Sequence, residues 1–275
     1  MTDRPPDLPD FDSPPVTEVV LGVQFNTIDG FISPHLGVVW ESYKAQYPKA
    51  EEHPSLAPTF ETFGQNPDVM NSVRLHLLTT AEMPRVFFIN EDRTQLLQIQ
   101  RDRFLHNWHK VGEGDNYPRF ERMIETFKDG IEKFIQVMIK EKLGPLTPNQ
   151  CEVSYINQIL LDDDRGLASF DRVFSGFANN LSIDELGTPE DGRFLFRYVI
   201  RREDNLAGRL LIAADPGRRQ DGRPIIQLVL TARGVPATQD LDGVINFLKV
   251  GRSHIVRAFA QVTSAEMHKK WRRRQ

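Results

Sequence analysis

Two histidines near the middle of the chain have the spacing that comes closest to a metal site. His106 and His109 lie three positions apart in Phe-Leu-His-Asn-Trp-His-Lys, and they would share a metal if this segment were helical. Gly112 and Gly114 follow closely and favour instead a strand end that enters a loop. Zinc needs further ligands, and no Glu-x-x-His motif or cysteine pair stands nearby. We therefore predict no metal here, and expect Trp108 to pack while the histidines cap or face solvent.

The remaining chemical candidates are an acidic cluster and a single cysteine. Asp162, Asp163 and Asp164 could gather Mg²⁺, but three consecutive carboxylates on a turn point in different directions, and a solvated turn is the favoured interpretation. A metal-dependent hydrolase that combines this cluster with one of the two histidines is left as an alternative. Nothing near Cys151 marks an activated thiolate, and the chain has no Gly-x-Ser-x-Gly motif or glycine-rich phosphate loop. We predict a protein that is not an enzyme and carries no cofactor.

Arginines on an alternating segment give the clearest indication of a binding surface. The sequence Arg-Phe-Leu-Phe-Arg-Tyr-Val-Ile-Arg occupies residues 193–201. In a strand, its arginines share one face and its aromatic residues the other. The expected ligand- or partner-binding residues are Arg193, Arg197, Arg201 and Arg209, with Arg74, His76 and Gln98 as the corresponding outward residues of the first half. The alternative is that these arginines only pair with carboxylates on neighbouring strands.

A second basic stretch lies at the C-terminus. It consists of Lys269, Lys270, Arg272, Arg273 and Arg274, with one tryptophan among them. Basic residues at a helix end complement the helix dipole, but they could also contact a nucleic-acid backbone or an acidic protein surface. We treat this stretch as a secondary candidate site.

The elements that must position these residues follow a pattern that occurs twice. Each half is predicted to contain a strand, a helix, four strands and a long helix. The domain boundaries that follow are a flexible tail over 1–15, a first unit over 16–149 and a second unit over 150–275. The predicted strands of the first unit are 18–25, 59–63, 73–80, 86–90 and 95–100, and its first helix is 34–47. The predicted strands of the second unit are 152–159, 181–186, 194–201, 209–213 and 225–231, and its first helix is 169–177.

The two long helices have the strongest pattern. Apolar residues recur at three- and four-residue spacing from Phe120 to Met138 and again from Val244 to Val262, so one stripe of each helix must be buried. Asp240 is a plausible N-cap for the second helix. Thr263 and Glu266 have the spacing of a capping box, which predicts a break and a new short helix.

Antiparallel strands grouped between helices predict an α+β fold. We expect the two units to pair edge to edge into one curved, pseudo-twofold antiparallel sheet with both long helices on one face. This order of elements resembles the duplicated saddle of TATA-box-binding proteins. No sequence motif of that family is present, so the resemblance implies no DNA binding.

Composition limits the classes of function. The chain has 275 residues, 40% of them hydrophobic, and a formal net charge of −4, which gives no bulk attraction to nucleic acid or anionic membrane. A single cysteine favours a reducing compartment. Residues 1–15 are rich in proline and aspartate, lack the features of a secretory signal, and are expected to bury no apolar area. No run approaches the roughly 20 apolar residues that cross a bilayer, so we expect a cytoplasmic location without membrane association.

Several short motifs together resemble one bacterial family. They are Pro-Val-Thr-Glu-Val-Val-Leu-Gly-Val-Gln-Phe at 15–25, Asn-Trp-His-Lys at 107–110, Tyr-Pro-Arg-Phe-Glu at 117–121, Tyr-Ile-Asn at 155–157 and the C-terminal 255–271. The chain is similar over nearly its whole length to a sporadically distributed family of about this length with no assigned activity. The resemblance implies a bacterial protein, in a family type that often travels with defence or mobile gene clusters.

These observations lead to two expected functions. The first is a non-catalytic protein that binds a protein partner through an open polar sheet face or the basic C-terminal helix. The alternative is the binding of an anionic small molecule or nucleic acid by the arginine-bearing face.

Overall fold

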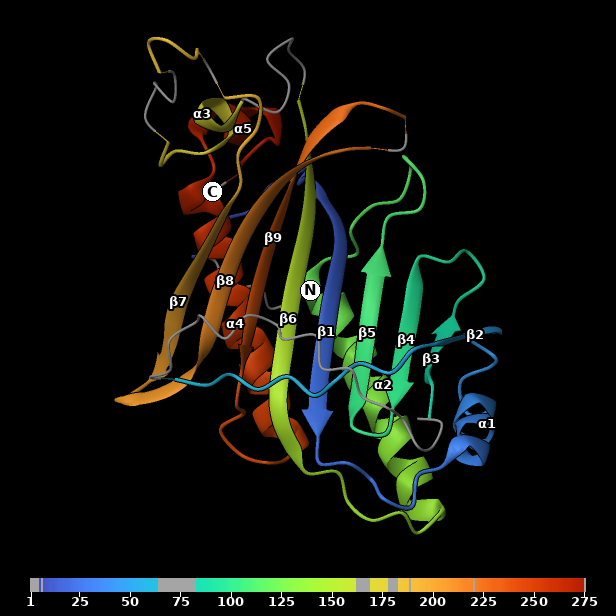
Figure 1. Ribbon diagram of the computed structural model, residues 1–275. Coiled ribbons are helices and arrows are strands. Elements are labelled where there is room, and N and C mark those ends of the chain that lie inside the picture. Colours follow the sequence, from blue (N-terminus) through green and yellow to red (C-terminus); the bar gives the residue numbers. More distant parts are fainter. Residues whose placement is uncertain are drawn as a thin grey trace.

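The computed structural model describes residues 5, 7–63, 83–161, 169–177, 183–187, 189–219 and 221–274. Within these residues, nine strands form one antiparallel sheet in the order β2-β3-β4-β5-β1-β6-β9-β8-β7 (Figure 1). The strands are β1 (Val16–Phe25), β2 (Lys49–His53), β3 (Arg85–Ile89), β4 (Gln95–Gln100), β5 (Arg103–His109), β6 (Pro148–Leu160), β7 (Phe194–Arg202), β8 (Asn205–Arg218) and β9 (Pro224–Gly234). The helices are α1 (Ser33–Glu41), α2 (Phe120–Lys140), α3 (Phe170–Val173), α4 (Leu241–Val262) and α5 (Ala265–Lys270). The predicted α+β class with an antiparallel sheet is confirmed.

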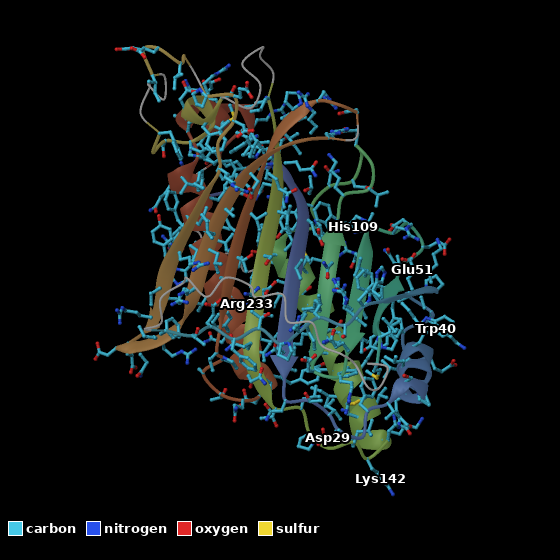
Figure 2. All side chains as sticks on the ribbon, in the orientation of Figure 1. Asp29, Trp40, Glu51, His109, Lys142 and Arg233 are labelled. Atoms are coloured by element: carbon cyan, nitrogen blue, oxygen red, sulfur yellow. The ribbon has the colours of Figure 1, made fainter. Side chains whose placement is uncertain are left out.

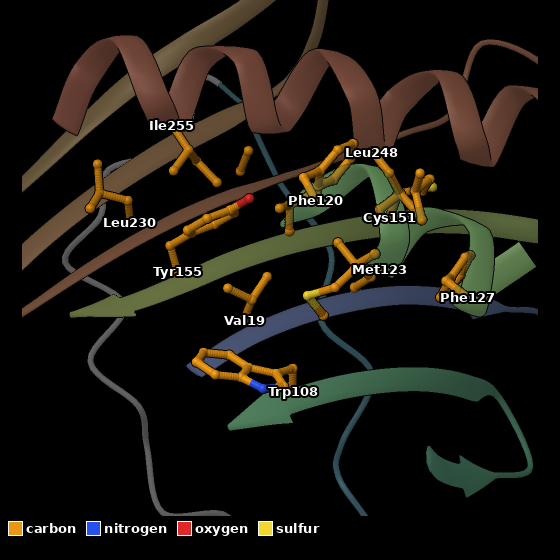
Figure 3. Close-up of a cluster of buried hydrophobic side chains, with 14 of the residues drawn as sticks. Val19, Trp108, Phe120, Met123, Phe127, Cys151, Tyr155, Leu230, Leu248 and Ile255 are labelled. Atoms are coloured by element: carbon orange, nitrogen blue, oxygen red, sulfur yellow. The ribbon is translucent and has the colours of Figure 1, made fainter. Parts of the chain in front are cut away.

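Both long helices lie against the same face of the sheet, as Figure 1 shows. The ring of Phe127 on α2 meets that of Phe104 on β5 edge to face at 5.7 Å. On α4, a Cβ at Gly251 would lie 3.1 Å from Ala232 of β9, so glycine at this position lets the helix approach the sheet closely. Figure 3 shows part of the resulting core. The predicted apolar stripes of both helices are therefore confirmed.

The ends of α4 and α5 are fixed by side-chain caps. The carboxylate of Asp240 accepts a hydrogen bond from the Gly243 amide at 2.8 Å, which confirms the predicted N-cap. The break before α5 is also present, but the expected capping box is wrong. Ser264 is the N-cap of α5, and the Thr263 hydroxyl donates instead to the Phe259 carbonyl at 2.6 Å.

The two halves of the chain meet at the centre of the sheet. β1 and β6 are adjacent there, and the strand order runs outward as β5-β4-β3-β2 on one side and as β9-β8-β7 on the other. In the described part of the first half, four strands lie between α1 and α2, but only β3 and β4 coincide with predicted strands. In the described part of the second half, three lie between α3 and α4.

Several predicted strands differ from those observed. Residues 59–63 are extended but belong to no strand, and residues 183–186 form a turn closed by a bridge between Ile183 and Gly187. The predicted strand at 73–80 lies outside the described residues. Two strands were missed: β2, whose Lys-Ala-Glu-Glu-His sequence lacks an apolar face, and β5, of which only the end was recognised.

The expectation that residues 1–15 bury no apolar area is wrong for residues 8 and 11. Leu8 and Phe11 are 1% and 4% exposed. The Phe11 ring contacts Phe259 at 5.4 Å and Trp271 at 6.2 Å, and the Asp12 amide donates to the Arg272 carbonyl at 3.1 Å. The N-terminal segment therefore packs on the end of α4 and on α5.

The longest described helices, α2 and α4, carry charged residues along their length. None of the helices in the described part of the chain is long and apolar enough to span a membrane.

Candidate functional site

The sheet face opposite α2 and α4, which we call the polar face, carries a row of hydrogen-bonded side chains. Arg85 on β3 donates to Gln98 on β4 at 2.9 Å, Gln98 donates to Asn107 on β5 at 2.9 Å, and Asn107 donates to Glu18 on β1 at 2.6 Å. Gln98 is only 8% exposed. This predicted binding residue therefore holds neighbouring strands together and is not open to a ligand.

An extended segment of the chain crosses the polar face. Residues 54–63, which we call the strap, run from the end of β2 over the front of the sheet toward β8 (Figure 1). Gln100 accepts from the Leu56 amide at 2.9 Å and donates to the Leu56 carbonyl at 2.7 Å. Gln24 accepts from the Thr59 amide at 2.9 Å. The backbone of the strap is thus held by side chains of the sheet, and the centre of the polar face is covered.

The end of the strap is held by two arginines of the second half. Glu61 lies 3.2 Å from Arg209 of β8 and 3.6 Å from Arg233 of β9. Figure 2 shows Arg233 near the middle of the sheet. Arg209 also stacks on the ring of Phe63, with 4.8 Å between its guanidinium carbon and the ring centre. Arg209 was predicted to bind a partner, but its guanidinium group is engaged by the strap.

A cavity of about 260 Å³ lies between the strap and the sheet. Its lining includes Gln24, Arg103, Gln150, Glu152 and Arg233. Arg103 donates to Gln24 at 2.7 Å and to the Ala57 carbonyl at 3.1 Å, both neutral acceptors. Burial lowers the pKa of the Arg103 guanidinium, although Asp102 and Glu152 partly oppose this shift. The cavity therefore contains a cationic group with only neutral direct partners among the described residues.

The three arginines of the 193–201 segment lie outside this covered region. Arg193, Arg197 and Arg201 are exposed, and none of their side chains has an ion pair or hydrogen bond within the described part of the chain. Arg197 pairs in register with Leu211, and Arg201 with Leu206. The residues opposite these two arginines are apolar, so for Arg197 and Arg201 the described residues do not supply the directly opposite carboxylate that the alternative interpretation expects.

The other face of β7 carries the aromatic residues, as predicted. Phe194 packs among Phe174 and Phe177, with ring centres 5.0 and 5.3 Å apart, and stacks on Phe196 at 4.9 Å. Beyond this cluster the helix layer does not cover β7, since α4 packs over β6, β8 and β9. Phe196 and Tyr198 consequently remain 43% and 51% exposed.

The basic C-terminal stretch is partly neutralised by the N-terminal segment. Arg274 forms ion pairs with Asp12 and, at 3.8 Å, with Asp10, while Arg273 lies 3.1 Å from His268. Lys270 donates to the Leu160 carbonyl at 3.4 Å. Arg272 contributes its backbone carbonyl to the docked segment. These contacts connect part of the stretch to the N-terminal segment, although all five basic residues, including Lys269, remain exposed.

The two histidines cannot share a metal. They lie three residues apart on β5, so their side chains project from opposite faces of the sheet. His106 is fully buried under α2 and contacts Gln95 at 3.2 Å, and this burial lowers its pKa to about 4. The expectation that both histidines cap or face solvent is therefore wrong for His106, whereas the packing of Trp108, 3% exposed, is confirmed.

No group of three metal-binding side chains is found among the described residues. The predicted alternatives at Asp162 to Asp164, and the candidate residues Arg74 and His76, lie outside these residues. Cys151 is buried, and burial raises the pKa of its thiol. A thiol in this state is a poor nucleophile.

The sequence interpretation missed the strap, Arg103 and Arg233. Pro54 and Pro58 were the available signal, because proline cannot donate to a strand ladder and disfavours a central strand. The alternating polar residues Gln98, Gln100 and Asn107 also indicated a face that needs internal partners.

Two comparisons with known proteins found no match. A scan against models of protein families gives no match, and a search of curated proteins gives no significant match either.

Proposed function

We propose that this chain is a non-catalytic protein that binds a protein partner through β7. The observation that carries the proposal is the state of Arg193, Arg197 and Arg201, which are exposed, have no ion pair or hydrogen bond to another described side chain and lie beside exposed apolar side chains. In contrast, Arg209 and Arg233, which lie beside the strap, have carboxylate partners. Arginine combined with aromatic residues is also the composition enriched at the centres of protein interfaces.

A charge-matched pair of variants tests this proposal. The first replaces Arg193, Arg197 and Arg201 with Gln; the control makes the same change at three exposed cations of α2, namely Arg122, Lys133 and Lys140. Because exposed charges contribute only about 0–1 kcal/mol each, both variants are expected to keep the unfolding free energy of the wild type within about 1 kcal/mol.

Affinity capture from the bacterial host, quantified by mass spectrometry, then compares the three proteins. We expect a protein captured by the wild type and by the α2 control to be lost from the β7 variant. Recovery of the same proteins by all three baits would refute the role of β7. Unfolding of the β7 variant alone would show that the arginines have a structural role.

The alternative, binding of an anionic small molecule, is supported by Arg103 in the cavity below the strap. The expected ligand carries a carboxylate or phosphate, because these groups complement a guanidinium. The midpoint of thermal unfolding of the wild type should be higher in phosphate or citrate than in chloride at equal ionic strength. The midpoint of the Arg103→Gln variant should be the same in all three salts. Equal midpoints in all three salts would remove this alternative. Nucleic acid is tested by adding oligonucleotides at low salt, where phosphate contacts are strongest.

We also propose that the chain arose by internal duplication, that it belongs to the bacterial family named above, and that it is cytoplasmic. The mirrored strand orders outward from β1 and β6 support duplicated β-α-β4-α units and a saddle-like curvature. The motifs from 15–25 to 255–271 support membership of the sporadic bacterial family and a role in a defence or mobile gene cluster. The lone cysteine supports a cytoplasmic location.

A further inference from the structure

The two edges of the sheet are built differently. The edge strand β2 has five residues, and four of them, Lys49, Glu51, Glu52 and His53, are charged or titratable. Short, charged edges are the usual protection against unwanted strand pairing. The other edge strand, β7, has nine residues, no proline and no acidic residue. In the described part of the chain its outer edge has no partner strand, so alternate backbone N–H and C=O groups face outward without a ladder.

Both faces of β7 expose apolar side chains beside that edge. Leu195 and Val199 on the polar face are 51% and 45% exposed, and Phe196 and Tyr198 on the helix face are 43% and 51% exposed. The arginines alone would be explained as charges that discourage aggregation at an edge. That explanation does not account for four large apolar side chains left exposed on the same strand.

We propose that β7 accepts a tenth strand from the partner, supplied by an extended segment in which acidic and apolar residues alternate. This inference rests on the proposed function and specifies how the partner binds. An added strand would hydrogen-bond to the free edge, and its side chains would alternate between the two faces of the sheet. Acidic residues on the polar face would meet Arg193, Arg197 and Arg201, which recur about every 13 Å along the strand. Apolar residues on the other face would cover Phe196 and Tyr198.

Charge argues against a second copy of the chain as the occupant. Residues 193–202 contain four arginines and no Asp or Glu, so two copies of β7 would bring eight arginines together. Like charges on paired strands are destabilising. The edge of β2 is more acidic, but Glu51 is already paired with Arg93 at 2.9 Å and Lys49 with Glu91 at 3.2 Å.

Synthetic peptides of nine residues, the length of β7, test the proposal directly. The probe alternates glutamate with valine. One control alternates lysine with valine, and a second has the probe sequence with alternate amides N-methylated, which removes donors on one edge while keeping the side chains. Fluorescence anisotropy measures affinity, and hydrogen exchange measures the protection of the β7 amides.

We expect the probe to bind about tenfold or more tightly than either control, and to slow the exchange of alternate β7 amides. The Arg193, Arg197 and Arg201 to Gln variant should weaken the probe by about tenfold, whereas the α2 control variant should not. In the free protein at low concentration, the same amides should exchange fast. Slow exchange there would show that the chain itself covers this edge and would overturn the proposal.

Other outcomes separate this inference from the proposed function. If the captured partner depends on the β7 arginines but its binding leaves the β7 amides unprotected, the partner contacts only side chains, and strand addition is wrong while the proposed function stands. If sedimentation shows self-association that changes in the β7 variant but not in the α2 control, the occupant is a second copy and the acidic partner strand is wrong. If neither the peptides nor any partner distinguish the β7 variant from the α2 control, both proposals fail.

Discussion

Truncation of Phe11 to alanine should destabilise the whole protein, although this residue lies close to the N-terminus. Its ring is 4% exposed and fills a site formed by Phe259, His268 and Trp271, with ring centres 5.4 to 6.2 Å away. The segment around it is held by an ion pair of 3.1 Å between Asp10 and Arg119. The contact therefore joins the first residues of the chain to α2, α4 and α5.

The expected loss of unfolding free energy is about 3 kcal/mol. Replacement of a buried Phe by Ala typically costs about 3–5 kcal/mol, because apolar burial is lost and a cavity remains. We take the lower end because a terminal segment can undock, so the loss cannot exceed the free energy of docking. For a chain of this size, about 2–4 °C of midpoint is lost per kcal/mol, which gives a decrease of roughly 6–12 °C.

Urea unfolding followed by tryptophan fluorescence is a suitable assay, since Trp271 lies beside Phe11. Ile139→Ala is the matched control, because Ile139 is apolar but 60% exposed and should change the unfolding free energy by no more than about 0.5 kcal/mol. A Phe11→Ala protein with the midpoint of the wild type would refute the docking of residues 7–15 and restore the expectation of a flexible tail.

Three further perturbations test the core and its buried charges. Phe127→Ala should cost about 3–5 kcal/mol in urea unfolding, since this ring is fully buried between α2 and β5; an unchanged midpoint would contradict the orientation of α2. His106 has a folded-state pKa of about 4, below the value of about 6.5 expected when unfolded, so the unfolded state binds more protons between these values and stability should fall as the pH drops from about 6.5 through 4. His106→Gln should flatten this dependence in pH-resolved denaturation, and an equally steep loss in the variant would assign it to other groups. Arg252 and Glu121 form a buried ion pair of 3.2 Å between α4 and α2, so Glu121→Gln should cost about 3–5 kcal/mol while the apolar double variant Glu121→Leu with Arg252→Met costs less; a double-mutant cycle without coupling would contradict this.

The sequence pattern was sufficient to predict which side chains are buried where this depends only on the periodicity of a single helix or strand. The alternation of residues 193–201 placed Phe194 and Arg197 on the correct faces of β7, because the period of a strand fixes the side on which each residue lies. The stripe through Phe127 likewise oriented α2. These predictions needed no knowledge of the residues on the other side of the contact.

The sequence pattern failed where the structure of a segment depends on contacts with residues far away in the sequence. Residues 59–63 are rich in the strand-forming types Thr and Phe, yet their backbone bonds to the side chains of Gln24 and Arg209 rather than to another strand. Phe11 looks like an apolar residue in a polar tail, and its ring packs against Phe259 and Trp271, about 250 positions further along. The candidate site was affected in the same way: Gln98 and Arg209 are outward by alternation, but internal residues occupy their polar groups.

The strap also has a consequence for how the protein is made. Glu61 and Arg209 are separated by 148 residues in the sequence, and a ribosome adds roughly 5–20 residues per second. Roughly 7–30 s therefore pass between the synthesis of the strap and that of its arginine partner. Within that interval β5 and β6 are synthesised and can pair with β1, while the strap still lacks its ion pair with Arg209. The ion pairs of Glu61 with Arg209 and Arg233 can form only when the nascent second half is long enough to complete the sheet.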